Sequence, residues 1–241
     1  RIGVTRPSRP IVPRIRVGLL SDIHANLPVL NAVLDDLPAD LDAICCAGDI
    51  VGYSAWPAEC VEREREVCDV VVRGNHDREV ENPDSYSGNE MARAGLNHAK
   101  AALSAEQRSW LTDLPPVTEA FDERLLLVHS HPENTDRYVS KGMFTSVRTY
   151  MSDKNQVLAL GHTHEQAAIN MARFDRHGWV VNPGSVGQPR DGNPKAAYAI
   201  VDLAALTVEL HRVSYPIAEV RSAHEAVGLP REAADRLEDT Y

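Results

Sequence analysis

The sequence contains only four cysteines, and none of them stands in a spacing that binds metal. Cys45 and Cys46 are adjacent within an apolar run, while Cys60 and Cys68 stand apart, so there is neither a CxxC pair nor a disulfide framework. Structural zinc sites are typically closed sets of cysteine and histidine, so a structural metal protein is set aside. We expect reduced, buried thiols in a cytoplasmic protein.

The sequence also lacks a long apolar run and an excess of basic residues. No run approaches the roughly 20 apolar residues that a transmembrane helix needs. The chain has 25 Lys and Arg against 35 Asp and Glu, a formal net charge of −10, so it shows no sign of the basic face of nucleic-acid-binding proteins. We therefore expect neither a membrane nor a nucleic-acid polymer as a partner, although a local metal site can still attract phosphate.

The first 14 residues differ in composition from the rest of the chain. They hold four Arg and three Pro, no acidic residue, and no apolar core of a secretory signal. We expect a flexible tail over residues 1–14 and, because a chain of 241 residues suits one substantial core, a single domain over residues 15–241. A homodimer is compatible with the sequence, and no pattern specifies one.

The first half of the chain alternates short apolar strands with helices. Strands are predicted within residues 15–20, 41–47 and 70–72, each followed by polar residues. The apolar spacing predicts a helix over residues 27–37 with Asn26 as its cap, followed by helices around 57–66 and 89–112.

From about residue 117 the chain is rich in short strands, and from Pro216 it predicts one or two amphipathic helices. This order favours an α/β fold with both parallel and antiparallel strand pairs. The predicted strands lie in the segments RLLLVHSHP, QVLALGHTHE, GWVVNPGSVG, AAYAIVDL and LTVELHRV.

Five of the predicted strands end in side chains that can bind metal. Because ligands of α/β sheets bind beyond the carboxyl ends of the strands, these ends can converge. Each motif alone is usually a turn or a helix cap, but turns do not explain the joint pattern. Carboxylate, imidazole and amide ligands without thiolate suit Mn, Fe, Co, Ni or Zn. The motifs are Asp22-x-His24, Gly48-Asp49, Gly74-Asn75-His76-Asp77, His129 and Gly161-His162-Thr163-His164.

The order and local context of these motifs resemble the calcineurin-like metallophosphoesterases, in particular their small bacterial and archaeal phosphodiesterase branch. The resemblance extends from about residue 15 to residue 203. It is carried by the segments SDIHANLPVLNAVL, CAGDIVGY, VVRGNHD, LLVHSHP, LALGHTHE and VNPGSVGQPRDGNPKAAYAIVD.

This resemblance implies a four-layer α/β/β/α sandwich, in which two mixed sheets lie face to face between helices and the site lies at the sheet ends. It implies two divalent transition metal ions, with Mn²⁺ first and Fe, Zn, Ni or Co as alternatives. Asp22, His24 and His164 would hold one ion, Asn75, His129 and His162 would hold the other, and Asp49 would bridge them. His76 would be the catalytic residue, protonating the departing alkoxide or stabilising charge on the phosphoryl group.

The function that follows is hydrolysis of a small soluble phosphate ester, by in-line attack of a hydroxide shared between two metal ions. A phosphodiesterase is favoured, and the alternatives are a phosphomonoesterase, a protein phosphatase or a metal-binding protein scaffold. The segment GDIVGYS lacks the second Asp and the Arg of the GDYVDRG pattern of protein phosphatases, which disfavours that alternative. All seven ligand positions and His76 are filled, which favours an enzyme over a scaffold.

Several further residues are candidates for the site, each with a competing interpretation. His131 adds a second imidazole in HSHP, where the branch more often has HGSP, but strand position favours His129 as the ligand. Tyr53 and the nearby Trp56 can stack on an aromatic substrate group or pack against their own loop. Asp77 can orient the ring of His76 or cap the following helix.

Two arginines are candidates for binding substrate phosphate. Arg190 lies in GQPRDG, and Arg78 directly follows GNHD. The guanidinium fork suits phosphate oxygens, but surface arginines are common.

Overall fold

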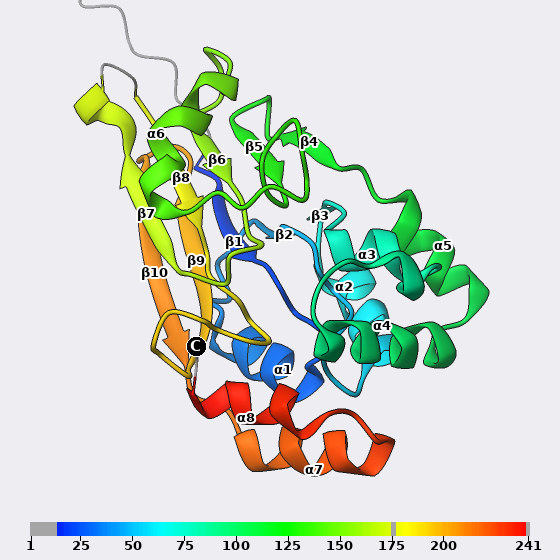
Figure 1. The fold of residues 1–241 in the computed structure, drawn as a ribbon. Coiled ribbons are helices and arrows are strands. Elements are labelled where there is room, and N and C mark those ends of the chain that lie inside the picture. The colour runs from blue at the N-terminus through cyan, green and yellow to red at the C-terminus, as the bar shows by residue number, and fades with distance from the viewer. Residues whose placement is uncertain (1–13, 175–176, 240–241) are drawn as a thin grey trace, which may run out of the picture.

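The first of two sheets contains three parallel strands and an antiparallel hairpin (Figure 1). The computed structural model describes residues 14–174 and 177–239. The strand order of this first sheet is β10-β9-β1-β2-β3. The strands are β1 (Arg16–Leu20), β2 (Ala43–Cys46), β3 (Val70–Val71), β9 (Ala196–Asp202) and β10 (Thr207–Val213). Because β1, β2 and β3 are parallel, their carboxyl ends lie at one edge of this sheet.

The second sheet has the order β4-β5-β6-β8-β7, with antiparallel strands at its two edges. Its three central strands, β5, β6 and β8, are parallel. The edge strands β4 and β7 lie outside the predicted strand segments. The bounds are β4 (Val117–Ala120), β5 (Leu125–Val128), β6 (Val157–Ala159), β7 (Ala167–Asn170) and β8 (Trp179–Asn182).

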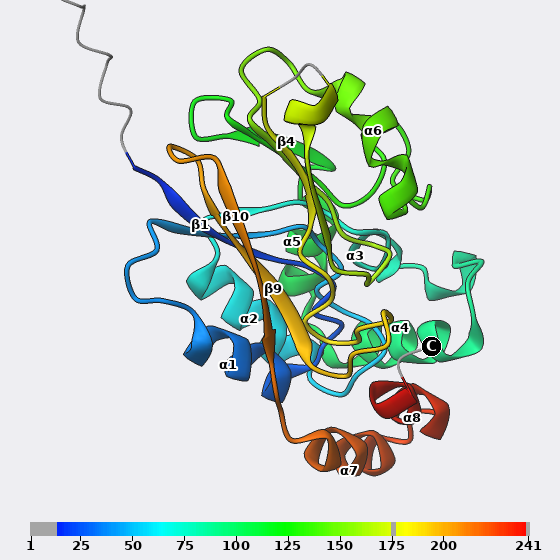
Figure 2. The ribbon, with the colours of Figure 1, turned by 90° about the vertical axis from the view of Figure 1, so that its left-hand side faces the viewer.

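Helices cover the outer faces of both sheets, so the predicted four-layer α/β/β/α sandwich is confirmed. Figure 2 shows the layers in sequence, from α1 and α2 through the two sheets to α6. Beside the first sheet lie α1 (Leu27–Asp36), α2 (Pro57–Val67), α3 (Asn75–Glu79), the 3₁₀ helix η1 (Pro83–Ser85), α4 (Glu90–Ala102), α5 (Ala105–Asp113), α7 (Ile217–Val227) and α8 (Arg231–Asp239). Beside the second lie η2 (Lys141–Met143), α6 (Phe144–Val147), η3 (Arg148–Tyr150) and η4 (Met171–Phe174).

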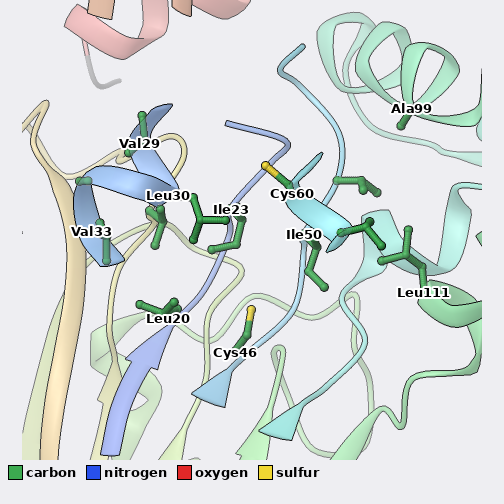
Figure 3. Close-up of a cluster of buried hydrophobic side chains, with 14 of the residues drawn as sticks. Leu20, Ile23, Val29, Leu30, Val33, Cys46, Ile50, Cys60, Ala99 and Leu111 are labelled. Atoms are coloured by element: carbon green, nitrogen blue, oxygen red, sulfur yellow. The ribbon is translucent and has the colours of Figure 1, made fainter. Parts of the chain in front are cut away.

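Alternation along the strands produces the separate hydrophobic layers. In β1, Val17 and Leu19 join the cluster between the two sheets, whereas Leu20 joins the cluster under the helices. Figure 3 shows that second cluster, with Leu20 and Cys46 below the α1 side chains Leu30 and Val33. Successive side chains of a strand point to opposite faces, so one strand serves two layers.

The C-terminal helices α7 and α8 pack into the hydrophobic cluster that lies between the first sheet and its helices. Val220 of α7 and Leu237 of α8 are buried in the cluster that contains Leu30. That residues 15–241 form a single domain stays a prediction. The predicted flexible tail over residues 1–14 falls, apart from Arg14, outside the described residues.

The prediction that the side chain of Asn26 caps α1 is wrong. Asn26 occupies the N-cap position, but its side chain makes no capping hydrogen bond. Its Nδ2 donates instead to the carbonyl oxygen of Gly187, 2.9 Å away. Pro28, early in the helix, has no N–H group for a cap to satisfy. Asn26 therefore ties the loop after β1 to the loop after β8.

Within residues 14–174 and 177–239, every helix is too short or too polar to span a lipid bilayer.

Candidate metal centre

The five polar strand ends meet at one place between the two sheets. The side chains predicted as metal ligands are all buried, with at most 6% of their surface exposed. They come from the residues after β1, β2, β3, β5 and β6, whose carboxyl ends point to the same end of the sandwich. The parallel pairing within each sheet is what brings these distant segments together.

The first group consists of Asp22, His24 and His164, whose ligand atoms form one cluster. The Nε2 atoms of His24 and His164 are 3.0 Å apart. Asp22 Oδ1 lies 3.4 Å from His164 Nε2 and 3.9 Å from His24 Nε2. Three donor atoms thus surround one point.

The second group consists of Asn75, His129 and His162. The Nε2 atom of His129 lies 3.2 Å from Asn75 Oδ1 and 3.1 Å from His162 Nδ1. This group has two imidazole nitrogens and an amide oxygen around a second point.

Asp49 lies between the two groups. Its Oδ2 atom is 3.9 Å from His24 Nε2 of the first group and 3.4 Å from His129 Nε2 of the second. Its Oδ1 atom accepts a hydrogen bond from the backbone N–H of His76 at 2.8 Å. One carboxylate oxygen is therefore directed to both groups while the other holds the start of α3.

The tautomers of His24 and His164 leave lone pairs that face each other. The Nδ1 atoms of His24, His129 and His164 each lie against a backbone carbonyl oxygen, at 3.2, 2.7 and 2.5 Å. A ring nitrogen beside a carbonyl oxygen carries the proton, so Nε2 of a neutral ring is an acceptor. The facing Nε2 atoms of His24 and His164 then have no proton between them, which fits a shared cation. Such backbone contacts are typical of histidines that bind metals.

The buried environment keeps most of these imidazoles neutral. Burial lowers the pKa of His24 and of His164 well below its ordinary value, and it lowers the pKa of His162 to about 3. For His129, burial acts in the same direction, but the Asp49 carboxylate outweighs it and raises the pKa to about 9. A divalent ion beside Asp49 would compete with that proton, so the residues fit a metal centre.

The backbone at this site is strained in the way expected of a functional centre. Left-handed backbone angles are uncommon for residues other than glycine. Five of the seven predicted ligands have them, namely Asp22, His24, Asp49, His162 and His164, with φ between 51° and 68°. Tight turns directly after the strands therefore aim these side chains at one another.

Asp77 acts through the backbone of the site. Asp77 lies inside α3, and its carboxylate accepts the N–H of Gly74 at the start of that helix, so it caps its own helix and not a following one. It also accepts the N–H groups of Asp49 at 2.8 Å and Ile50 at 2.9 Å. Asp77 thereby joins the turn that carries Asp49 to the helix that carries Asn75.

His76 is buried beside the first group and is held by two tyrosines. Its Nε2 atom lies 3.2 Å from the hydroxyl oxygen of Tyr86, and its ring stacks on Tyr53 with centroids 5.1 Å apart. Burial lowers its pKa to about 4. The sequence analysis missed Tyr86, because no local spacing connects this residue to the strand ends.

The structure separates the two histidines of HSHP. His129 contacts the second group, as described above, whereas the ring of His131 packs edge-on against Tyr150 at 5.0 Å. His131 also lies against Arg137, with 3.4 Å between ring and guanidinium nitrogens. This arrangement favours His129 as the ligand.

The candidate substrate residues Arg78, Tyr53 and Arg190 differ in their surroundings. Arg78 donates to Thr135 at 2.9 Å and to Asp136 at 2.7 Å, so its guanidinium already ties α3 to the loop after β5. Tyr53 is 3% exposed, which favours the packing interpretation over stacking on a substrate. The Arg190 guanidinium lies 5.5 Å from the centre of the Tyr53 ring and donates to Gln188 Oε1 at 2.7 Å. Its charge helps to lower the pKa of His24 and of His164, so Arg190 lies near the first group and remains a candidate for contacting phosphate.

The fold and these side chains define a metal-dependent phosphoesterase, and the chain belongs to the calcineurin-like phosphoesterase superfamily. The model for the superfamily domain matches residues 15–205, most of the chain. The predicted family and the predicted enzyme class, a hydrolase of phosphoric esters, are thereby confirmed.

Three relatives illustrate this membership. Phosphodiesterase YfcE of Escherichia coli is 30% identical over 211 residues, which cover 80% of this chain and 91% of YfcE. An uncharacterized protein of Methanocaldococcus jannaschii is 31% identical over 239 residues, covering 92% of this chain and 96% of that protein. The crystal structure of a metallophosphoesterase from Sphaerobacter thermophilus has 32% identity and a TM-score of 0.81, covering 94% of this chain and 99% of that one.

Proposed function

We propose that this protein is a dinuclear metal-dependent phosphodiesterase. The observation that carries the proposal is the pair of imidazole clusters on either side of Asp49, each with ring nitrogens facing one another about 3 Å apart. Asp22, His24 and His164 would hold one ion, and Asn75, His129 and His162 would hold the other. Asp49, directed to both, would bridge them, and Mn²⁺ is the first choice for the oxygen and nitrogen donors present.

When bound, such ions supply a water of lowered pKa and positive charge for the phosphate oxygens. In the proposed hydrolysis, the water oxygen bonds to phosphorus and gives up a proton to solvent, the bond to the departing ester oxygen breaks, and that oxygen takes up a proton from solvent. His76 is the side chain placed to donate a hydrogen bond to the departing oxygen or to a phosphoryl oxygen. With a pKa of about 4, its ring is neutral at neutral pH, so it stabilises negative charge through its one N–H and does not supply the proton itself. Arg190 is the candidate for neutralising a phosphate oxygen.

The size and charge of the substrate follow from the composition. The net charge of −10 disfavours polyanions, which supports a small phosphate ester rather than a nucleic-acid polymer. The name of YfcE supports a diester as the substrate class. All four cysteines are free, which supports the cytoplasm as the compartment.

The test is turnover of bis-p-nitrophenyl phosphate beside p-nitrophenyl phosphate, using protein stripped of metal and then reloaded with Mn²⁺. We expect no activity after stripping, recovery on reloading, and faster turnover of the diester. A faster monoester would indicate a phosphomonoesterase. No turnover of either compound would favour a metal-binding scaffold, and activity that is indifferent to chelation would refute the metal mechanism.

Two variants test the separate roles proposed for Asp49 and His76. Asp49→Ala should lose metal and activity together, because both groups lose their shared carboxylate. His76→Ala should keep both metals, measured by elemental analysis, and lose mainly kcat. If His76→Ala loses metal instead, the assignment of His76 to the chemical step is wrong.

A further inference from the structure

Tyr138 is an exposed aromatic residue at the candidate metal centre. Among the described residues, the large apolar side chains most open to solvent are Tyr138, Leu210 and Val227, and Tyr138 is 57% exposed. Its ring lies on the ring of His162, with centroids 4.1 Å apart and an angle of 34° between the planes. One face of Tyr138 therefore covers a predicted metal ligand while much of the ring stays open to solvent.

Hydrogen bonds hold the loop that carries Tyr138 to its own start and to α3. Ser130 donates a hydrogen bond to the carbonyl oxygen of Arg137, which closes the loop after β5. Arg78 of α3 donates to Thr135 at 2.9 Å and Asp136 at 2.7 Å. Arg78, a candidate for binding phosphate in the sequence analysis, is thus engaged in holding this loop. The ring is presented by a loop tied to the helix that carries the catalytic candidate.

Tyr138 and His76 contact different ligand groups. His76 packs against His24 of the first group, at 4.8 Å between ring centroids. Tyr138 packs against His162 of the second group. A diester held between the two groups with its departing oxygen next to His76 would therefore direct its second ester group toward the second group, where Tyr138 lies.

We propose that Tyr138 is a specificity-determining residue that stacks on a planar aromatic group, an aryl or nucleobase ring, carried by the ester that stays on phosphorus. This inference rests on the proposed phosphodiesterase function and adds the substrate class. A tyrosine face suits such a group because stacking is broadly tolerant of which ring it meets. A monoester has no second ester group, so this contact also favours diesters.

The test measures binding by calorimetry, so that it does not depend on turnover. The probes are diphenyl phosphate and dimethyl phosphate, added to the Mn²⁺-loaded protein. Because truncation removes the stacked ring, Tyr138→Ala should weaken the binding of diphenyl phosphate about tenfold, which is about 1.4 kcal/mol. The affinity of Tyr138→Ala for dimethyl phosphate should differ from that of the wild type by less than about twofold. Tyr138→Phe should bind both probes as the wild type does.

Controls separate stacking from simple support of His162. Metal content of Tyr138→Ala should equal that of the wild type. Tyr150→Ala removes a tyrosine that packs on His131, not on His162, and should not discriminate between the probes. Equal weakening of both probes in Tyr138→Ala, loss of its metal, or unchanged binding of diphenyl phosphate would overturn the inference. Failure of the proposed function would appear separately, as absence of turnover in the wild type.

Discussion

Replacing Asp77 by asparagine tests whether one buried carboxylate holds the bridging residue in place. The two oxygens of Asp77 accept the backbone N–H groups of Asp49, Ile50 and Gly74 at 2.8 to 2.9 Å, and Val51 N lies 3.4 Å away. Asparagine has the same shape but only one oxygen, so its NH₂ group would face at least one of these donors.

The magnitude follows from the number of donors left without an acceptor. A buried donor without a partner costs about 1–3 kcal/mol, so one or two of them amount to about 3 kcal/mol. That is a large part of the roughly 5–15 kcal/mol by which a domain is stable. Because the turn that loosens carries Asp49, Asp77→Asn should also lower metal affinity although Asp77 is not itself a predicted ligand.

The assay is urea unfolding of metal-free protein, followed by elemental analysis after reloading with Mn²⁺. The matched control is Asp84→Asn, an exposed carboxylate in η1, which should change stability by less than about 0.5 kcal/mol. If Asp77→Asn unfolds at the wild-type urea concentration and binds metal normally, the carboxylate does not hold the Asp49 turn.

Three further predictions concern the surroundings of the site and the C-terminal helices. Tyr86→Phe removes the hydroxyl that contacts His76, so kcat should fall about fivefold with metal content unchanged; an unchanged kcat would contradict a positioning role. Gly52→Ala places a methyl group 2.2 Å from His76 Nδ1 and should lower kcat about a hundredfold. The control is Gly192→Ala, which should not lower kcat, because Gly192 also has a positive φ but has open space around it. Equal kcat in both variants would refute the steric argument. Burial lowers the pKa of His224 from 6.5 to about 4, so the unfolded chain takes up a proton that the folded protein does not, and the free energy of unfolding falls as pH drops below about 6.5. His224→Gln should remove about 2 kcal/mol of the acid destabilisation in urea unfolding at about pH 5 and none at about pH 7.5; the same pH dependence in both proteins would contradict this assignment.

The local patterns around the strand ends were sufficient to predict where the candidate ligands lie. Each motif directly follows a buried run, as Asp49 follows β2 and His129 follows β5. Strand ends are visible in a sequence because apolar residues stop and turn residues begin within a few positions. Convergence of the motifs then follows from parallel pairing, which the alternation of strands and helices already favoured.

The sequence pattern did not predict several other elements. The edge strand β7 (Ala167–Asn170) is short and only partly buried, so its pattern is weak. The short helical turns over residues 141–150 follow no marked apolar spacing. Asn26 has the residue type of a helix cap, but a loop far along the chain supplies its partner, Gly187.

The sequence by itself determined an α/β fold and the order of the candidate ligands, because these depend on residue type and spacing within short segments. The four-layer arrangement was implied by the resemblance of those motifs to the family. Only the tertiary structure decided which residues surround those ligands. It placed Tyr86 on His76, Tyr138 on His162 and the guanidinium of Arg78 on the loop after β5. Such contacts join side chains from separate segments, and local spacing carries no information about which distant segment will lie alongside. They form when packing of the sheets and helices brings those segments together.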